Sequence, residues 1–338
     1  MHKLGAVGAD LGAVACFFDR CWDRPAAGLK DDWKAAVLNW AGFGLRAVGR
    51  LGEAAEVFEA GLNARVEQEN WENAAISAGN LSELWLTVGE VAKAVEYGRR
   101  SVEYADRSGD WFQRESKRTT LADGLHQAGQ VVEAEELFKE AEGMQRERQP
   151  GYEYLYSLWG YRFCDLLLGQ GKFEEVKKRA EWAIKIAQRN NWLLDIGLDN
   201  LSLGRAYLGE AVEEGTGEFG KAGGYLEKAV AGLREAGTQD WLPRGLLART
   251  GLWREMGNYE KAWGDLAEAR EIARRGGMKL YLADCGLEGC KLLLAEGKKE
   301  EAQRELRKAK AMIEEMGYRR RDGEVEEIER GMEHGWGG

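Results

Sequence analysis

Glycine recurs about every forty residues along this chain, and a small apolar residue follows it five positions later. The glycines are Gly49, Gly89, Gly129, Gly171, Gly257 and Gly297, and the residues that follow are Ala54, Ala94, Ala134, Val176, Ala262 and Ala302. The interval from Gly171 to Gly257 is two periods that carry an insertion. A fixed period of this length is typical of repeat arrays, which present extended binding surfaces.

Each period predicts a helix, a short turn, a second helix and a loop. In residues 71–110, Ile76, Leu81, Leu84 and Val88 fall on one helical stripe, and Gly89 follows as the left-handed residue that ends a helix. The 338 residues include only three prolines, which favours long helices. The 45 glycines favour close approach between helices, and they predict a loosely stable array.

The period divides one domain, residues 1–338, into seven helix pairs. We expect repeats at about 33–70, 71–110, 111–151, 152–191, 192–240, 241–277 and 278–317. An entry helix within 1–28 and a polar capping helix at 322–332 would cover the two ends. The fifth repeat carries a swollen turn at 209–219. Most repeats begin with a large apolar residue, such as Trp71 or Trp241, which we expect to pack between neighbouring repeats.

These residues resemble tetratricopeptide (TPR) repeats. Leu203-Gly204-Arg205-Ala206-Tyr207 matches the first-helix pattern of that family, and Ala134, Phe138 and Ala141 match the second-helix pattern. The period is longer than the usual one, as in the long-helix subgroup of bacterial regulators. The resemblance implies an all-α fold, a right-handed α-solenoid of about seven helix pairs.

A second resemblance concerns the stretches 121–129, 148–152 and 161–168. They look like a bacterial group of TPR arrays that are often the C-terminal module of large NACHT- or NB-ARC-type proteins. This implies a sensing or regulatory module of a larger signalling or defence protein. The sequence has no GxxxxGK[ST] phosphate-binding loop, so we expect any NTPase to lie in a separate domain or protein.

The TPR resemblance implies that the first helices line a concave wall. Inward positions then fall thirteen, ten, six and three residues before each turn residue. The binding candidates are Asn39, Glu83, Asp123, His126, Tyr161, Asp165, Arg205, Arg244, Arg254, Asp284 and Lys291. The middle of this wall is acidic and aromatic, and arginines follow. We expect it to hold a peptide or partner helix with a basic centre, and the arginines to grip a carboxylate. The alternative is a solvated wall whose charges pair with one another.

The composition argues against several other functions. A net charge of −10 disfavours nucleic acid, and the basic run Arg319–Arg321 is expected to be a solvated helix end. The five cysteines form no zinc-binding pairs, so we expect reduced, mostly buried thiols in a cytoplasmic protein. We expect no cofactor, no metal and no association with membranes.

Asp123 and His126 are the only residues that suggest acid–base chemistry. Three positions apart on a helix, they are ordinary neighbours, and no nucleophile or metal-ligand set accompanies them. We therefore expect no catalytic residues and no enzyme activity. The two remaining hypotheses are a protein-interaction scaffold and a ligand-sensing regulatory module.

Overall fold

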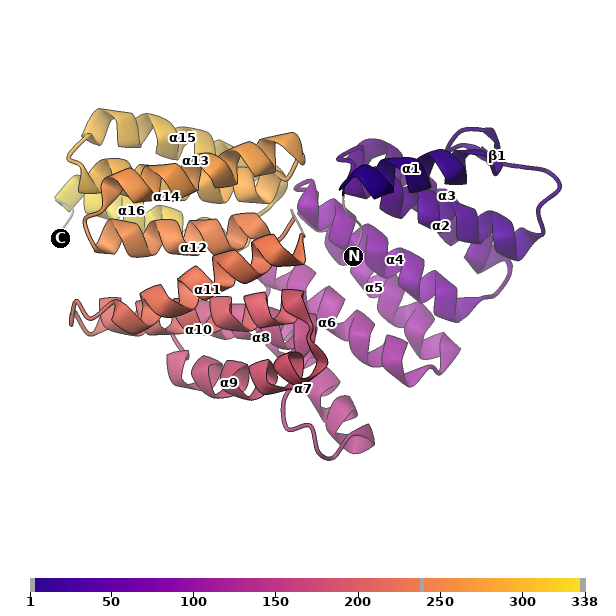
Figure 1. Ribbon diagram of the computed structural model, residues 1–338, viewed down its shortest axis with the longest axis horizontal. Coiled ribbons are helices and arrows are strands. Elements are labelled where there is room, and N and C mark those ends of the chain that lie inside the picture. Colours follow the sequence, from indigo (N-terminus) through magenta and orange to yellow (C-terminus); the bar gives the residue numbers. More distant parts are fainter. Residues whose placement is uncertain (1–3, 238–239, 335–338) are drawn as a thin grey trace. The chain divides into compact units, whose positions relative to one another are not determined.

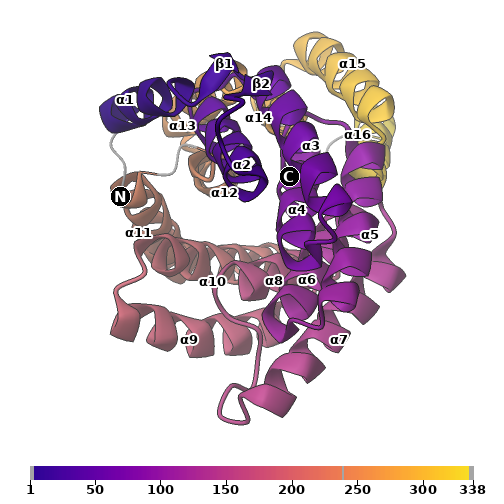
Figure 2. The ribbon, with the colours of Figure 1, turned by 90° about the vertical axis from the view of Figure 1, so that its right-hand side faces the viewer.

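Helices make up nearly all of the computed structural model, which describes residues 4–237 and 240–334 (Figure 1). The chain divides into two compact units, residues 1–144 and residues 145–338. Helices pair with their neighbours along the chain in both units; α4 (Trp71–Thr87) lies beside α5 (Val91–Ser108), and α10 (Leu193–Glu213) beside α11 (Gly220–Ala236), in Figures 1 and 2. The described residues thus form seven helix pairs between Asp31 and Met316, in an all-α fold as expected.

Unit 1 begins with one helix and a short hairpin, and three helix pairs follow. Its elements are α1 (Leu4–Ala15), β1 (Phe18–Arg20), β2 (Arg24–Pro25), α2 (Asp31–Ala47), α3 (Leu51–Glu67), α4 (Trp71–Thr87), α5 (Val91–Ser108), α6 (Trp111–Gln127) and α7 (Val131–Arg148), whose last turn belongs to unit 2. The core of this unit includes Leu45, Phe58 and Leu81, each at most 1% exposed.

Unit 2 contains four helix pairs, a short 3₁₀ turn and a last helix. Its elements are α8 (Ser157–Gly169), α9 (Phe173–Asn190), α10 (Leu193–Glu213), α11 (Gly220–Ala236), α12 (Leu242–Glu255), α13 (Tyr259–Arg275), α14 (Lys279–Ala295), α15 (Lys299–Met316), η1 (Arg319–Arg321) and α16 (Asp322–His334). Its core runs through Leu201, Leu226, Leu246 and Leu266, which come from four successive helices.

The turn glycines have the left-handed conformation that the period predicts. Their φ values are 80°, 86°, 78°, 70°, 70° and 76°, in the order Gly49, Gly89, Gly129, Gly171, Gly257 and Gly297. A residue with a Cβ is strained at such angles, which explains why glycine stands there. All six residues five positions later are completely buried. Each marks the place where the second helix of a pair packs closely on the first.

Two details differ from the sequence-based expectation. The entry helix ends at Ala15, and Phe18–Pro25 form a two-stranded antiparallel hairpin in place of further helix. The swollen turn of the fifth repeat is shorter than 209–219, because α10 continues to Glu213. Residues 238–239, which precede the sixth repeat, lie outside the described residues.

Several helix glycines are points of close approach, as expected from their number. A Cβ on Gly204 of α10 would lie 2.7 Å from the Leu226 side chain of α11. A Cβ on Gly286 of α14 would lie 2.8 Å from that of Ala309 on α15. The aromatic residues that begin the repeats differ in burial. Trp71 stacks on Tyr104, whereas Trp33 is 54% exposed.

None of the described helices is both long enough and apolar enough to cross a membrane.

Candidate functional site

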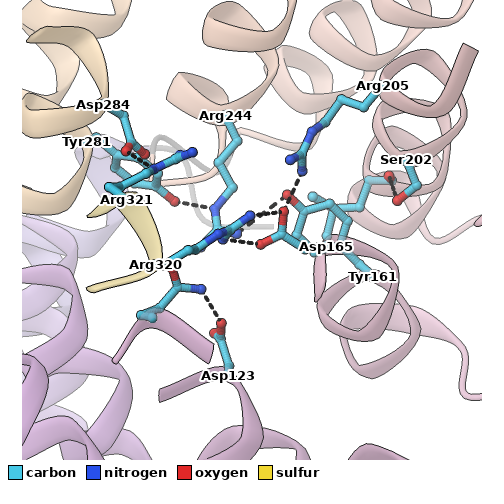
Figure 3. A network of polar contacts seen from close by, with 12 residues as sticks. Asp123, Tyr161, Asp165, Ser202, Arg205, Arg244, Tyr281, Asp284, Arg320 and Arg321 are labelled. Atoms are coloured by element: carbon cyan, nitrogen blue, oxygen red, sulfur yellow. Dashed lines mark hydrogen bonds and ion pairs between the residues drawn. The ribbon is translucent and has the colours of Figure 1, made fainter. Parts of the chain in front are cut away.

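The first helices of the four pairs in unit 2 carry seven of the predicted wall residues. Helix α8 contacts α10, α10 contacts α12, and α12 contacts α14. Their wall residues are joined by the network of polar contacts that Figure 3 shows in part. We call these residues the unit 2 wall: Tyr161, Asp165, Arg205, Arg244, Arg254, Asp284 and Lys291.

Asp165 on α8 holds two guanidinium groups. Arg205 of α10 donates to its Oδ1 at 2.5 Å, and Arg320 of η1 donates to Oδ2 and Oδ1 at 2.6 and 2.9 Å (Figure 3). The Asp165 side chain is only 4% exposed. Burial alone would lower the pKa of Arg320, but the carboxylate raises it above its usual value. Asp165 is therefore a buried, charge-assisted anchor for guanidinium groups.

Arg244 of α12 lies among three aromatic rings. Its guanidinium carbon is 4.8 Å from the ring centroid of Trp241, 5.4 Å from that of Tyr281 and 5.6 Å from that of Tyr161. It donates to the hydroxyl of Tyr281 and, at 3.4 Å, to that of Tyr161 (Figure 3). Burial raises the pKa of Tyr281 despite the nearby arginine, so this hydroxyl stays neutral. Ring faces attract cations, so the rings fix the direction of Arg244.

Asp284 of α14 is the second acidic point of the unit 2 wall. Arg321 donates to its Oδ1 at 2.8 Å, and the Tyr318 hydroxyl donates to its Oδ2 at 3.4 Å. Arg321 also donates to Glu324 at 2.8 Å, and Lys291 of α14 donates to Glu324 at 2.6 Å. Burial alone would raise the pKa of Glu324, but Lys291 and Arg321 hold it well below its usual range.

Lys291 and Arg254 meet at Glu288 of α14. Lys291 donates to Glu288 Oε1 at 3.2 Å, and the Arg254 guanidinium lies 3.8 Å from Oε2. Arg254 also pairs with Glu255 on its own helix at 2.5 Å. Along this part of the unit 2 wall, charges of opposite sign pair with one another. This pairing is what we expect under the alternative, in which the charges of the wall pair with one another and bind no ligand.

The other four candidates lie in unit 1, on the first helices α2, α4 and α6. Asn39 of α2 accepts from Asn80 of α4 at 3.4 Å. Glu83 of α4 lies 3.7 Å from Arg46 of α2. Asp123 of α6 accepts from Gln127, one turn along the same helix, at 2.9 Å. His126 of α6 is 3% exposed.

The sequence reading missed Tyr281, Glu288, Tyr318, Arg320, Arg321 and Glu324. Tyr281 and Glu288 could have been found by following the inward face of α14 one turn to either side of Asp284. The expectation that Arg319–Arg321 is a solvated helix end was wrong for two of its three residues. Arg319 is indeed exposed, but the side chains of Arg320 and Arg321 are 12% and 24% exposed and hold ion pairs within unit 2.

Within the described residues, no group of three or more His, Cys, Asp or Glu side chains is placed to hold a metal ion. All five cysteines are free thiols; Cys164, Cys285 and Cys290 are buried, whereas Cys16 and Cys21 are exposed. Burial raises the pKa of each buried thiol to about 12, so these thiols are poor nucleophiles near neutral pH. The unit 2 wall therefore offers anchors for charged groups.

No protein-family model matches this chain, and no curated protein matches it either. Solved structures do resemble it. A Rap protein complexed with Competence and Sporulation Factor has a TM-score of 0.57 and 12% identity, over 97% of this chain and 99% of that one. The Rap conjugation gene regulator of the plasmid pLS20, in complex with the Phr* peptide, has a TM-score of 0.55 and 12% identity, over 94% of this chain and 86% of that one. At this identity the likeness concerns the fold, which is a TPR-like helical repeat.

Proposed function

We propose that this chain is a peptide-binding scaffold whose unit 2 wall holds an extended peptide with an arginine near its centre. One observation carries the proposal: Asp165 already binds a guanidinium from a residue 155 positions away in the sequence. Within unit 2 the row of first helices thus curves far enough for η1 to reach α8. A surface of this form can surround an extended segment.

The charges of the unit 2 wall support an arginine in preference to a lysine. A carboxylate accepts two parallel N–H bonds from a planar guanidinium, as Asp165 does from Arg320, and an ammonium group lacks that geometry. Arg205 and Arg244 lie on the next two first helices and provide positive charge for a carboxylate of the same peptide. Both Rap proteins described above were solved with a bound factor or peptide, which is consistent with this use of the fold.

An array of immobilised heptapeptides that differ only in their central residue tests the proposal. We expect the full chain to bind arginine-centred peptides more strongly than lysine-, alanine- or glutamate-centred ones. Asp165→Asn should weaken arginine-centred binding about tenfold to a hundredfold, because hydrogen bonds to charged groups contribute about 1.5–3 kcal/mol.

Asp265→Asn is the matched control for that experiment. Asp265 of α13 also holds an arginine through two bonds, from Arg249 at 2.7 Å each, but it lies on the second helix of its pair. This variant should bind as the unchanged chain does. Equal binding of arginine-centred peptides by Asp165→Asn and by the unchanged chain would contradict the proposal.

We also propose that the repeats form one continuous domain, and that peptide binding serves a regulatory role in a cytoplasmic bacterial protein without enzyme activity. The likeness to a conjugation gene regulator favours the regulatory role. In the narrower form of this hypothesis, the chain is the C-terminal module of a larger NACHT- or NB-ARC-type protein. Sequencing the native reading frame tests it: an upstream NTPase domain would support a sensing module, and a stand-alone gene would favour a scaffold.

A further inference from the structure

The two arginine partners of Asp165 carry more positive charge than one carboxylate needs for neutralisation. Arg205 of the neighbouring helix already supplies one guanidinium at 2.5 Å, and Arg320 supplies a second. Arg320 is not part of any helix pair, since it lies in the 3₁₀ turn that joins α15 to α16. We propose that the Arg320 side chain is an intramolecular ligand of a guanidinium site, and that an arginine from a bound peptide displaces it.

The geometry at Asp165 is that of ligand recognition. Arg320 donates through Nη1 and Nη2 to both carboxylate oxygens, at 2.6 and 2.9 Å. This two-point contact is the form in which carboxylates select guanidinium over ammonium groups. The two side chains are 12% and 4% exposed, so the contact is largely shielded from water and from salt.

The backbone around Arg320 can stay in place while its side chain leaves. Tyr318 is 2% exposed on one side, and Val325 and Ile328 of α16 are buried on the other. Arg321 keeps separate partners, Asp284 and Glu324. Release of Arg320 from Asp165 therefore breaks the two bonds between them and requires rotation about the side-chain bonds of Arg320, without movement of the backbone of η1. Asp165 keeps Arg205 as a partner, so the site does not become an uncompensated buried charge.

The consequence is a site that is closed to weak ligands. A tethered group has an effective concentration in the millimolar range or above, so a free ligand of the same intrinsic affinity must exceed that concentration to replace it, whereas a peptide with further contacts displaces it at lower concentration. Removal of the Arg320 guanidinium should open the site. This inference rests on the proposed function, and it adds that a group of the chain itself regulates access to the peptide site.

The test uses N-acetylarginine amide, a single blocked arginine, and the full chain in isothermal titration calorimetry. Arg320→Ala should bind it at least tenfold more tightly than the unchanged chain does. N-acetyllysine amide should bind that variant more weakly, and Asp165→Asn added to Arg320→Ala should abolish binding of the arginine probe. Thermal melts followed by circular dichroism establish that each variant is folded, and Arg320→Gln is a second variant that keeps a polar side chain.

Arg319→Ala is the matched control, because Arg319 belongs to the same turn but is exposed and pairs only loosely with Asp322, at 3.4 Å. It should behave as the unchanged chain does. Equal affinity of Arg320→Ala and the unchanged chain for the probe would overturn the inference while leaving peptide binding intact. Absence of binding to both Arg320 variants would overturn it as well. Tight binding of the probe to Arg320→Ala, together with peptide arrays that do not respond to Asp165→Asn, would refute the proposed function and displacement by a peptide, while Arg320 would stand as the intramolecular ligand of a guanidinium site.

Discussion

Glu324 is the carboxylate whose protonation at low pH should destabilise the unit 2 wall. Its side chain is 19% exposed and accepts from Lys291 and Arg321, which hold its pKa below the usual 4.5. A group whose pKa is lower in the folded than in the unfolded state stabilises the fold above the unfolded value. That contribution is lost as the pH falls from about 4.5 towards the folded pKa. The pKa of Lys291 is raised above 10.5, so its contribution is instead lost in alkali.

Glu324→Gln should lower the free energy of unfolding at pH 7 by about 1–3 kcal/mol, since a charged acceptor is lost from a buried network. The gap between the unchanged chain and the variant should narrow when the pH falls from 7 to 3.5, because Glu324 then binds a proton in the unfolded chain, whereas its lowered pKa keeps it ionised in the folded chain. Thermal melts at a series of pH values measure this gap. Glu327→Gln, on an exposed position of α16, should show no gap at any pH. A Glu324→Gln gap that is constant from pH 7 to 3.5 would rule out this role.

At the scale of helices, the glycines fall into two kinds that a sequence cannot separate. Gly204 of α10 faces α11, where an added Cβ would lie 2.7 Å from the Leu226 side chain and 3.1 Å from its backbone nitrogen. Gly264 of α13 is exposed, and nothing lies within 4 Å of its Cβ position. The first kind allows a pair of helices to pack closely, whereas the second only weakens its own helix.

Gly204→Ala and Gly264→Ala should therefore change stability in opposite directions. The first variant forces α10 and α11 apart and should cost about 1–3 kcal/mol, as overpacking of a core does. The second should add about 0.5–1 kcal/mol, because alanine is the better helix former. Urea titrations followed by circular dichroism give both values. A stability change of the same sign in both variants would show that helix propensity, and not contact between helices, governs these positions.

The period of forty was enough to predict the helix pairs and the left-handed turn glycines. The TPR resemblance implied that Asp165, Arg205, Arg244 and Asp284 lie on one wall, because the first helices repeat the same geometry. It could not reveal Arg320 as a partner of Asp165. The two residues are 155 positions apart, and their meeting depends on the accumulated curvature of four helix pairs. Locally, Arg319–Arg321 looks like any charged helix end.

Across the whole molecule, an individual ion pair is weak evidence of function. Exposed pairs such as that of Arg99 with Glu133 contribute little to stability and mark no site. Asp165 differs because it is buried and accepts from two arginines, one of which comes from a turn outside the helix pairs. This combination distinguishes Asp165 from an ordinary ion pair between neighbouring repeats.

A crystal structure of the full chain with an arginine-centred heptapeptide from the array tests the central claim most directly. We expect the central guanidinium of the peptide within hydrogen-bonding distance of both Asp165 carboxylate oxygens, with the Arg320 side chain turned away. The arginines at 321 and 205 should keep their present partners. A peptide bound elsewhere on the chain, with the contact between Arg320 and Asp165 intact, would contradict the account.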